Sequence, residues 1–134
     1  MCEFVNKPTK ERRNEIKEEI LILHYQINKL HRFKYLLRDE ERHSYYIIEN
    51  YKDEKDVLDL KIKEDSSLFS RYSGYYDRDA KDLEIYKNKK VILDISEEIE
   101  FLNIKIGGLL HSQSVIDTHI KKCTYDIKNL ESFL

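Results

Sequence analysis

Five histidines are the side chains best suited to bind a metal or move a proton near neutral pH, but their spacing serves neither task. Three fall in the first half of the chain and two in the second: His24, His31, His43, His111 and His119. No two of them are four residues apart, and no group of cysteines or carboxylates has the spacing of a zinc site. We therefore expect neither a metal nor a cofactor.

The carboxylates, cysteines and serines do not form a catalytic pattern either. The 26 acidic residues are interspersed with 24 basic ones, and at helical spacing such a mixture forms ion pairs on a solvent-facing surface. Cys2 and Cys123 lie at opposite ends of the chain, and Cys123 falls on an apolar stripe, where a small buried side chain is expected. Four serines between residues 66 and 73 mark a loop, not a nucleophile elbow. We predict that the chain is not an enzyme.

Composition excludes further functional classes. A net charge of -2 provides no basic surface for nucleic acid. No apolar run approaches the roughly 18 residues of a transmembrane helix, and the first residues lack the apolar core of a secretory signal. Only three glycines and one proline occur in 134 residues, which indicates long helices. We expect a cytoplasmic protein with no membrane insertion and no nucleic-acid partner.

The second half of the chain carries a long apolar stripe, and the helix that must present it is the clearest element of the sequence. Steps of three and four residues reach thirteen positions, of which only Gln113 is polar: Ile92, Ile95, Ile99, Leu102, Ile106, Leu109, Gln113, Ile116, Ile120, Cys123, Ile127, Leu130 and Leu134. This 3.5-residue repeat predicts a coiled-coil-like helix over about residues 77–133. A buried Gln113 would cost stability and fix the register of packing.

Gly107 and Gly108 fall inside this predicted helix. Each costs about 1 kcal/mol relative to alanine in a helix interior. The stripe crosses both glycines without a change of phase, which favours one continuous helix, straight or bent at this point. The alternative is a turn between two shorter helices. Small residues here would also let another backbone approach closely.

The first half shows the same spacing. Thr9, after Pro8, is a predicted N-cap, and a stripe follows at Ile16, Ile20, Leu23, Ile27 and Leu30. Beyond Leu30 the phase blurs, and an apolar face continues through Phe33, Leu36, Leu37, Tyr45, Ile48, Tyr51, Leu58 and Ile62, interrupted by Lys34, Glu41 and Lys55. We predict a flexible start at 1–8, a helix over about 9–63 and a turn over about 64–76. The fold class is all-α: residues 1–134 form one long antiparallel two-helix hairpin.

Both predicted helices carry more apolar residues than one seam can bury. The additional residues are Leu21, Ile22, Tyr25, Tyr35, Leu83, Tyr86, Val91, Leu93, Phe101, Ile104, Leu110 and Val115. A two-helix hairpin buries one side of each helix, so these residues need a second surface. We predict a homodimer or a hetero-complex that forms a bundle of about four helices, with the two apolar stripes as interface candidates.

The stretch RYSGYYDRD, residues 71–79, joins the two predicted helices. Gly74 allows the chain to reverse, and Asp77 and Asp79 suit the positive N-terminal end of the second helix. A helical hairpin with an aromatic-x-glycine turn resembles the WXG family, the small helical proteins of type VII (ESX-type) secretion in Gram-positive bacteria. Tyr72-Ser73-Gly74 stands where that family has Trp-x-Gly. The long arms look more like the small coiled-coil proteins that accompany LXG toxins.

This resemblance implies a non-enzymatic adaptor. It would pair with the helical N-terminal domain of an LXG-type toxin and help to target the toxin for export. The protein would remain cytoplasmic or leave the cell through type VII secretion without a signal peptide. The alternative is a self-associating coiled-coil protein, such as a phage or mobile-element inhibitor that acts by surface binding. A tight homodimer with no need for a partner would favour that alternative.

Overall fold

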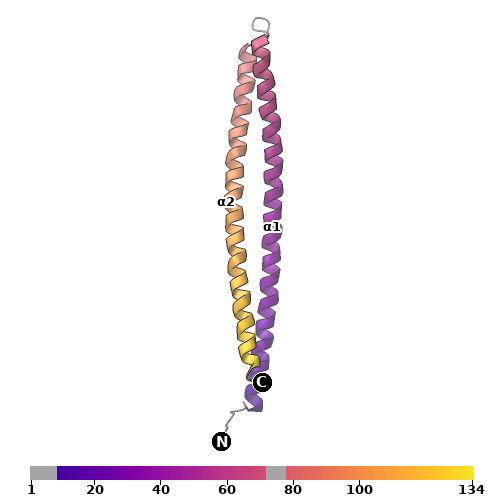
Figure 1. Ribbon diagram of the computed structural model, residues 1–134, viewed down its shortest axis with the longest axis vertical. Helices are drawn as coiled ribbons and strands as arrows, with labels where there is room; N and C mark the ends of the chain where they lie inside the picture. Colours follow the sequence, from indigo (N-terminus) through magenta and orange to yellow (C-terminus); the bar gives the residue numbers. More distant parts are fainter. Residues whose placement is uncertain (1–8, 72–77) are drawn as a thin grey trace. The chain divides into compact units, whose positions relative to one another are not determined.

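The computed structural model describes residues 9–71 and 78–134, and two helices account for nearly all of them (Figure 1). Helix α1 spans Lys10–Arg71 and helix α2 spans Arg78–Glu131. The described residues contain no strand, and the two helices pack against each other, which confirms the predicted all-α hairpin. Neither helix contains a stretch long and apolar enough to cross a membrane.

The ends of the helices follow from local hydrogen bonds. Thr9 caps α1 as predicted: its Oγ1 accepts a hydrogen bond of 3.2 Å from the backbone N–H of Arg12. At the other end α1 continues to Arg71, so the predicted turn over about 64–76 starts eight residues too early. Serine and aspartate lower helix propensity only slightly, and tertiary packing overrides that preference. Helix α2 begins at Arg78 and ends at Glu131, two residues before its predicted end.

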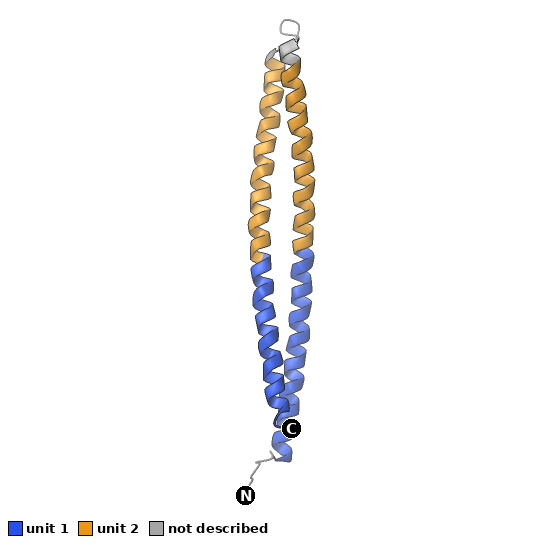
Figure 2. Cartoon of the chain, viewed as in Figure 1, with its two compact units in different colours: residues 1–40, 109–134 blue, residues 41–108 orange. Residues whose placement is uncertain are grey.

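The chain divides into two compact units (Figure 2). Unit 1 comprises residues 1–40 and 109–134. Within it the helix segments are antiparallel, since Gln26 lies opposite Cys123 while Lys34, further along α1, bonds the earlier residue Asp117 of α2. Ile16 and Ile127 are the buried apolar side chains of this unit.

Unit 2 comprises residues 41–108. Its core is a cluster in which Ile48 of α1 packs against Leu102 and Ile106 of α2. Half-buried Ile47, Tyr51 and Ile99 surround this cluster. A core this small means that most of the apolar side chains in the unit stay in contact with water.

One face of each helix forms the seam within these units. On α2 the predicted stripe is buried or half-buried from Ile92 to Leu130, including Gln113, and only the terminal Leu134 is exposed. Helical geometry continues through Gly107 and Gly108, which confirms the favoured continuous helix over the alternative turn. A Cβ added at either glycine would meet no atom of the described residues within 4 Å outside the adjacent backbone of α2, so no other described segment occupies the space that they leave.

The seam on α1 differs from the expected face after Leu30. Three-four spacing continues through Lys34, Leu37, Glu41, Ser44, Ile48, Tyr51, Lys55, Leu58, Ile62 and Asp65, all of them buried or half-buried. The predicted apolar continuation through Phe33, Leu36 and Tyr45 is wrong, because these three side chains are exposed. Lys34, Glu41 and Lys55 therefore belong to the seam, where long side chains can bury their stems and keep their charges near water.

Candidate protein-interaction site

The predicted interface stripes lie between the chain's own helices. The residues in question are Ile92, Ile95, Ile99, Leu102, Ile106, Leu109, Ile116, Ile120, Ile127 and Leu130 on α2, and Ile16, Ile20, Leu23, Ile27 and Leu30 on α1. Each is buried or half-buried in its own unit. Surface for a partner must therefore come chiefly from other side chains.

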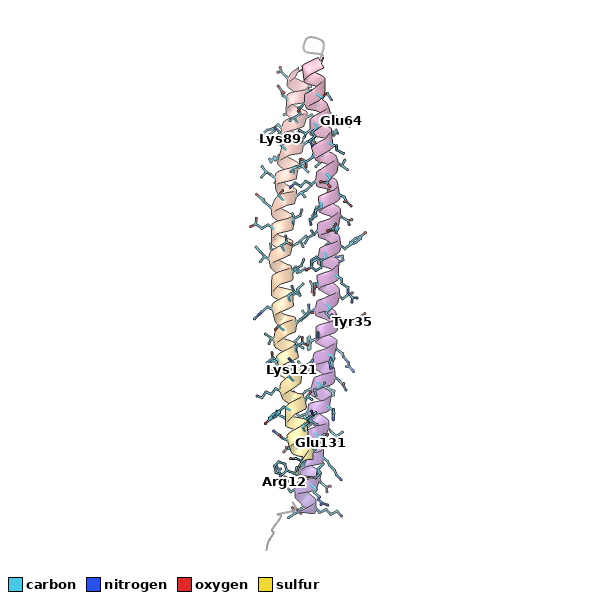
Figure 3. The ribbon with its side chains drawn as sticks, in the orientation of Figure 1. Arg12, Tyr35, Glu64, Lys89, Lys121 and Glu131 are labelled. Atoms are coloured by element: carbon cyan, nitrogen blue, oxygen red, sulfur yellow. The ribbon has the colours of Figure 1, made fainter. Side chains whose placement is uncertain are left out.

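Those other side chains are the apolar residues that lie outside the seam between the two helices. All twelve that were expected to need a second surface remain exposed in the structure, from Leu21 on α1 to Val115 on α2. Side chains project outward from both helices as well as toward the opposite helix (Figure 3). Sequence reasoning left out further exposed members, among them Tyr46, Val57, Leu60 and Tyr125. They could have been found by noting that they also lie off the 3.5-residue stripe.

In unit 2 most of the exposed apolar residues of α2 lie on one side of the helix, and Val91 is the exception beside the seam. Five of them, which we call the outer stripe, are 52–70% exposed: Leu83, Tyr86, Leu93, Phe101 and Ile104. At about 100° per residue they lie roughly opposite the seam residues Ile95 and Leu102. Lys90 and Glu97 occupy the same side of the helix. The outer stripe is thus an amphipathic face with no partner among the described residues.

In unit 1 two hollows follow each other along one flank of the seam. The first, of about 410 Å³, is lined by Glu19, Ile22, Leu23, Asp126, Asn129 and Leu130. The second, of about 320 Å³, is lined by Gln26, Lys29, Leu30, Phe33, His119 and Cys123. Gln26 and Cys123 are each one helical turn from a residue of the first hollow, so the two hollows form one groove, which we call the unit-1 groove. Apolar side chains make up about half of its lining.

A polar cluster links the two helices near the described end of unit 2. Lys81 Nζ lies 3.4 Å from Oδ1 of Asp65 and 3.3 Å from Oε2 of Glu84, while Lys61 Nζ lies 3.4 Å from Oε1 of Glu84. Hydrogen bonds to Glu84 and then Asp65 raise the pKa of Lys81, so its amine stays protonated and is a poor nucleophile. The bond from Lys81, followed by that from Lys61, lowers the pKa of Glu84. This cluster joins the two helices within unit 2.

The remaining candidates for chemistry are few. No group of three or more His, Cys, Asp or Glu side chains could hold a metal ion in residues 9–71 and 78–134. Cys123 is half-buried and lines the unit-1 groove, with its Sγ 4.0 Å from Oε1 of Gln26. Tyr72 and Gly74, which carry the resemblance at the turn, lie outside the described residues.

No protein-family model matches the chain, and a comparison with curated proteins and with solved structures finds no match either. Function is therefore inferred from the surfaces of the chain itself and from the resemblance of its turn.

Proposed function

We propose that this chain is a non-enzymatic adaptor that binds a helical segment of another protein. The outer stripe is the observation that carries the proposal. Five large apolar side chains on one side of α2 lie in water, although monomeric proteins rarely leave such a stripe uncovered. Their helical spacing suits a partner helix that lies alongside α2 and completes a bundle.

The partner that we propose is the helical N-terminal domain of an LXG-type toxin, and the complex would be delivered to a type VII secretion system. The hairpin fold and the Tyr72-Ser73-Gly74 sequence support this choice through their likeness to WXG proteins and to the small companions of LXG toxins. Lys90 and Glu97, which lie on the same side of α2 as the outer stripe, would limit the choice of partner, since a wrong helix would meet a like charge.

Co-expression with the product of a neighbouring LXG gene tests the proposal. The expected result is a stable complex that survives purification and dissociates when the outer stripe is made polar by Leu93→Ser and Ile104→Ser. Leu21→Ser provides a control, because it alters an exposed apolar residue of unit 1 that does not line the unit-1 groove. The absence of an LXG gene nearby would contradict the choice of partner, and a failure to co-purify with an LXG domain would do the same.

A further inference from the structure

The outer stripe has the same order of apolar side chains from either end. Leu83 and Ile104 are equally distant from a point midway between residues 93 and 94, and both are aliphatic. Tyr86 and Phe101 are the next pair at equal distances from this midpoint, and both are aromatic. Leu93 lies beside the midpoint itself. All five side chains are 52–70% exposed, so the two halves of the stripe present matching apolar surfaces to water.

The charged residues on this side of α2 follow the same midpoint with opposite signs. Lys90 and Glu97 lie at equal distances on its two sides, and both are exposed. About two turns of helix, or about 10.5 Å, separate them, which brings both to the same side of α2. Around the midpoint an apolar residue therefore mirrors an apolar residue, while a cation mirrors an anion.

From this order we infer that the outer stripe pairs with the outer stripe of a second copy of the chain, with the two α2 helices antiparallel. A two-fold axis through the midpoint places Lys90 of each copy opposite Glu97 of the other, so that two ion pairs form between the chains. The same rotation places aliphatic opposite aliphatic and aromatic opposite aromatic side chains along the stripe. Two-fold interfaces require this self-complementarity, because every contact occurs twice.

The shape of the stripe suits such a pair of helices. From Leu83 to Ile104 its members lie within about 80° of the circumference of α2 and span about 32 Å. This length is about three heptads, at which an apolar seam becomes typical of a coiled coil. Asp94 borders the stripe next to the axis and approaches its own counterpart in the second copy. Lys90 lies one turn before Asp94 on the same flank and offsets this repulsion.

This inference deepens the proposed function, and its consequence for regulation rests on that proposal. A partner helix and a second copy use the same side of α2, so only one of them binds at a time. Without a partner, the second copy keeps the apolar side chains of the stripe out of water. Binding of the partner then requires dissociation of the dimer, so the apparent affinity for the partner falls as the chain becomes more concentrated.

Charge reversal tests the homodimer on the full-length chain, by sedimentation over a range of protein concentrations. The wild-type chain is expected to dimerise. Lys90→Glu and Glu97→Lys are each expected to weaken dimerisation about tenfold, because like charges then face each other twice. The doubly reversed Lys90→Glu/Glu97→Lys chain is expected to recover dimerisation, since each pair again joins opposite charges. Glu98→Lys, an exposed substitution about 100° further around α2, is the matched control and should leave the dimer unchanged.

Three results would overturn the inference. A wild-type chain that stays monomeric at all concentrations rules out the second copy. A dimer that tolerates both single reversals places the interface elsewhere. Single reversals that weaken the dimer, without recovery in the doubly reversed chain, show that Lys90 and Glu97 do not face each other. Circular dichroism of each variant ensures that loss of dimer is not loss of helix.

Titration with an LXG-type N-terminal domain separates this inference from the proposed function. A hetero-complex that forms as the homodimer disappears supports both. A homodimer that does not bind the domain contradicts the proposed function and leaves the pairing of the two copies in place. A monomeric chain that binds the domain contradicts the inference alone, and a hetero-complex in which the homodimer persists contradicts the shared use of the outer stripe.

Discussion

Lys34 Nζ lies 2.6 Å from Oδ1 of Asp117, so an ion pair joins α1 to α2 within unit 1 across 83 positions of sequence. Lys34 is one of the charged residues at seam positions, where an apolar side chain would be expected in a regular coiled coil. The seam thus contains charged side chains among its aliphatic ones, while other large apolar side chains stay exposed.

Stability should fall in acid. The hydrogen bond from Lys34 lowers the pKa of Asp117, and bonds from Lys81 and Lys61 lower that of Glu84. Carboxylates with a lowered pKa stabilise the fold above their unfolded-state pKa, and this contribution disappears as pH falls through the folded-state pKa. We expect the urea midpoint to be steady near neutral pH and to decline below about pH 4. Asp117→Asn should reduce the decline, whereas Asp56→Asn, at an exposed position, should not; equal profiles would argue against the pairing.

Two isoleucines on α2 provide a direct test of the seam. Ile106 is 4% exposed and packs in the cluster with Ile48, whereas Ile104, two residues away, is 70% exposed. Ile106→Ala should lower the free energy of unfolding by about 2–4 kcal/mol, since it leaves a cavity. Ile104→Ala should change it by only about 0.5 kcal/mol. Urea unfolding followed by circular dichroism measures both, and similar losses at the two positions would contradict the orientation of α2.

The two glycines of α2 should lower the free energy of unfolding, because they weaken the helix and no packing contact in the described residues requires them. Gly107 and Gly108 lie in a helix, and the space for a Cβ is open at both. Gly107→Ala and Gly108→Ala should each raise the free energy of unfolding by about 1 kcal/mol. A rise in the thermal midpoint of both variants is the expected observation. Destabilisation by either alanine would mean that a neighbour occupies the space.

Ser44 is another position at which a substitution to alanine should raise the free energy of unfolding. Its side chain is buried in unit 2, at 1% exposure, and its hydroxyl has no hydrogen-bond partner among the residues that the structure describes. Ser44→Ala should stabilise the chain by about 1 kcal/mol or more, because an unpaired buried hydroxyl is costly. Ser112→Ala, at an exposed position of α2, corrects for the gain in helix propensity. If Ser44→Ala raises the free energy of unfolding no more than Ser112→Ala does, the hydroxyl of Ser44 forms a hydrogen bond in solution and the explanation is wrong.

The sequence predicts α2 better than α1 for a physical reason. From Ile92 to Leu130 almost every seam position is aliphatic, so polarity alone reveals the inward face. On α1, Lys34 faces inward while Phe33 faces outward, and no rule based on polarity separates them. Only the rigid three-four spacing, continued from Leu30 without regard to residue type, recovers the seam. The predicted end of α1 is too early because Asp65 and the serines that follow it are weak helix formers that nevertheless remain helical.

The surfaces for partners were only partly predictable. The excess of apolar residues was visible, since one seam cannot bury both Leu93 and Leu102. The unit-1 groove was not, because Glu19 and Asp126 are 107 positions apart and meet only when the antiparallel register is known.

The central claim is that the outer stripe binds a helical partner, and the affinity for an LXG-type N-terminal domain tests it most directly. Isothermal titration of that domain into the wild-type chain and into the Leu93→Ser/Ile104→Ser variant compares the two affinities. We predict a defined complex with the wild-type chain and binding at least about tenfold weaker for the variant, with the unfolding midpoint unchanged. Equal affinities for both proteins, or no binding by the wild-type chain, would contradict the claim.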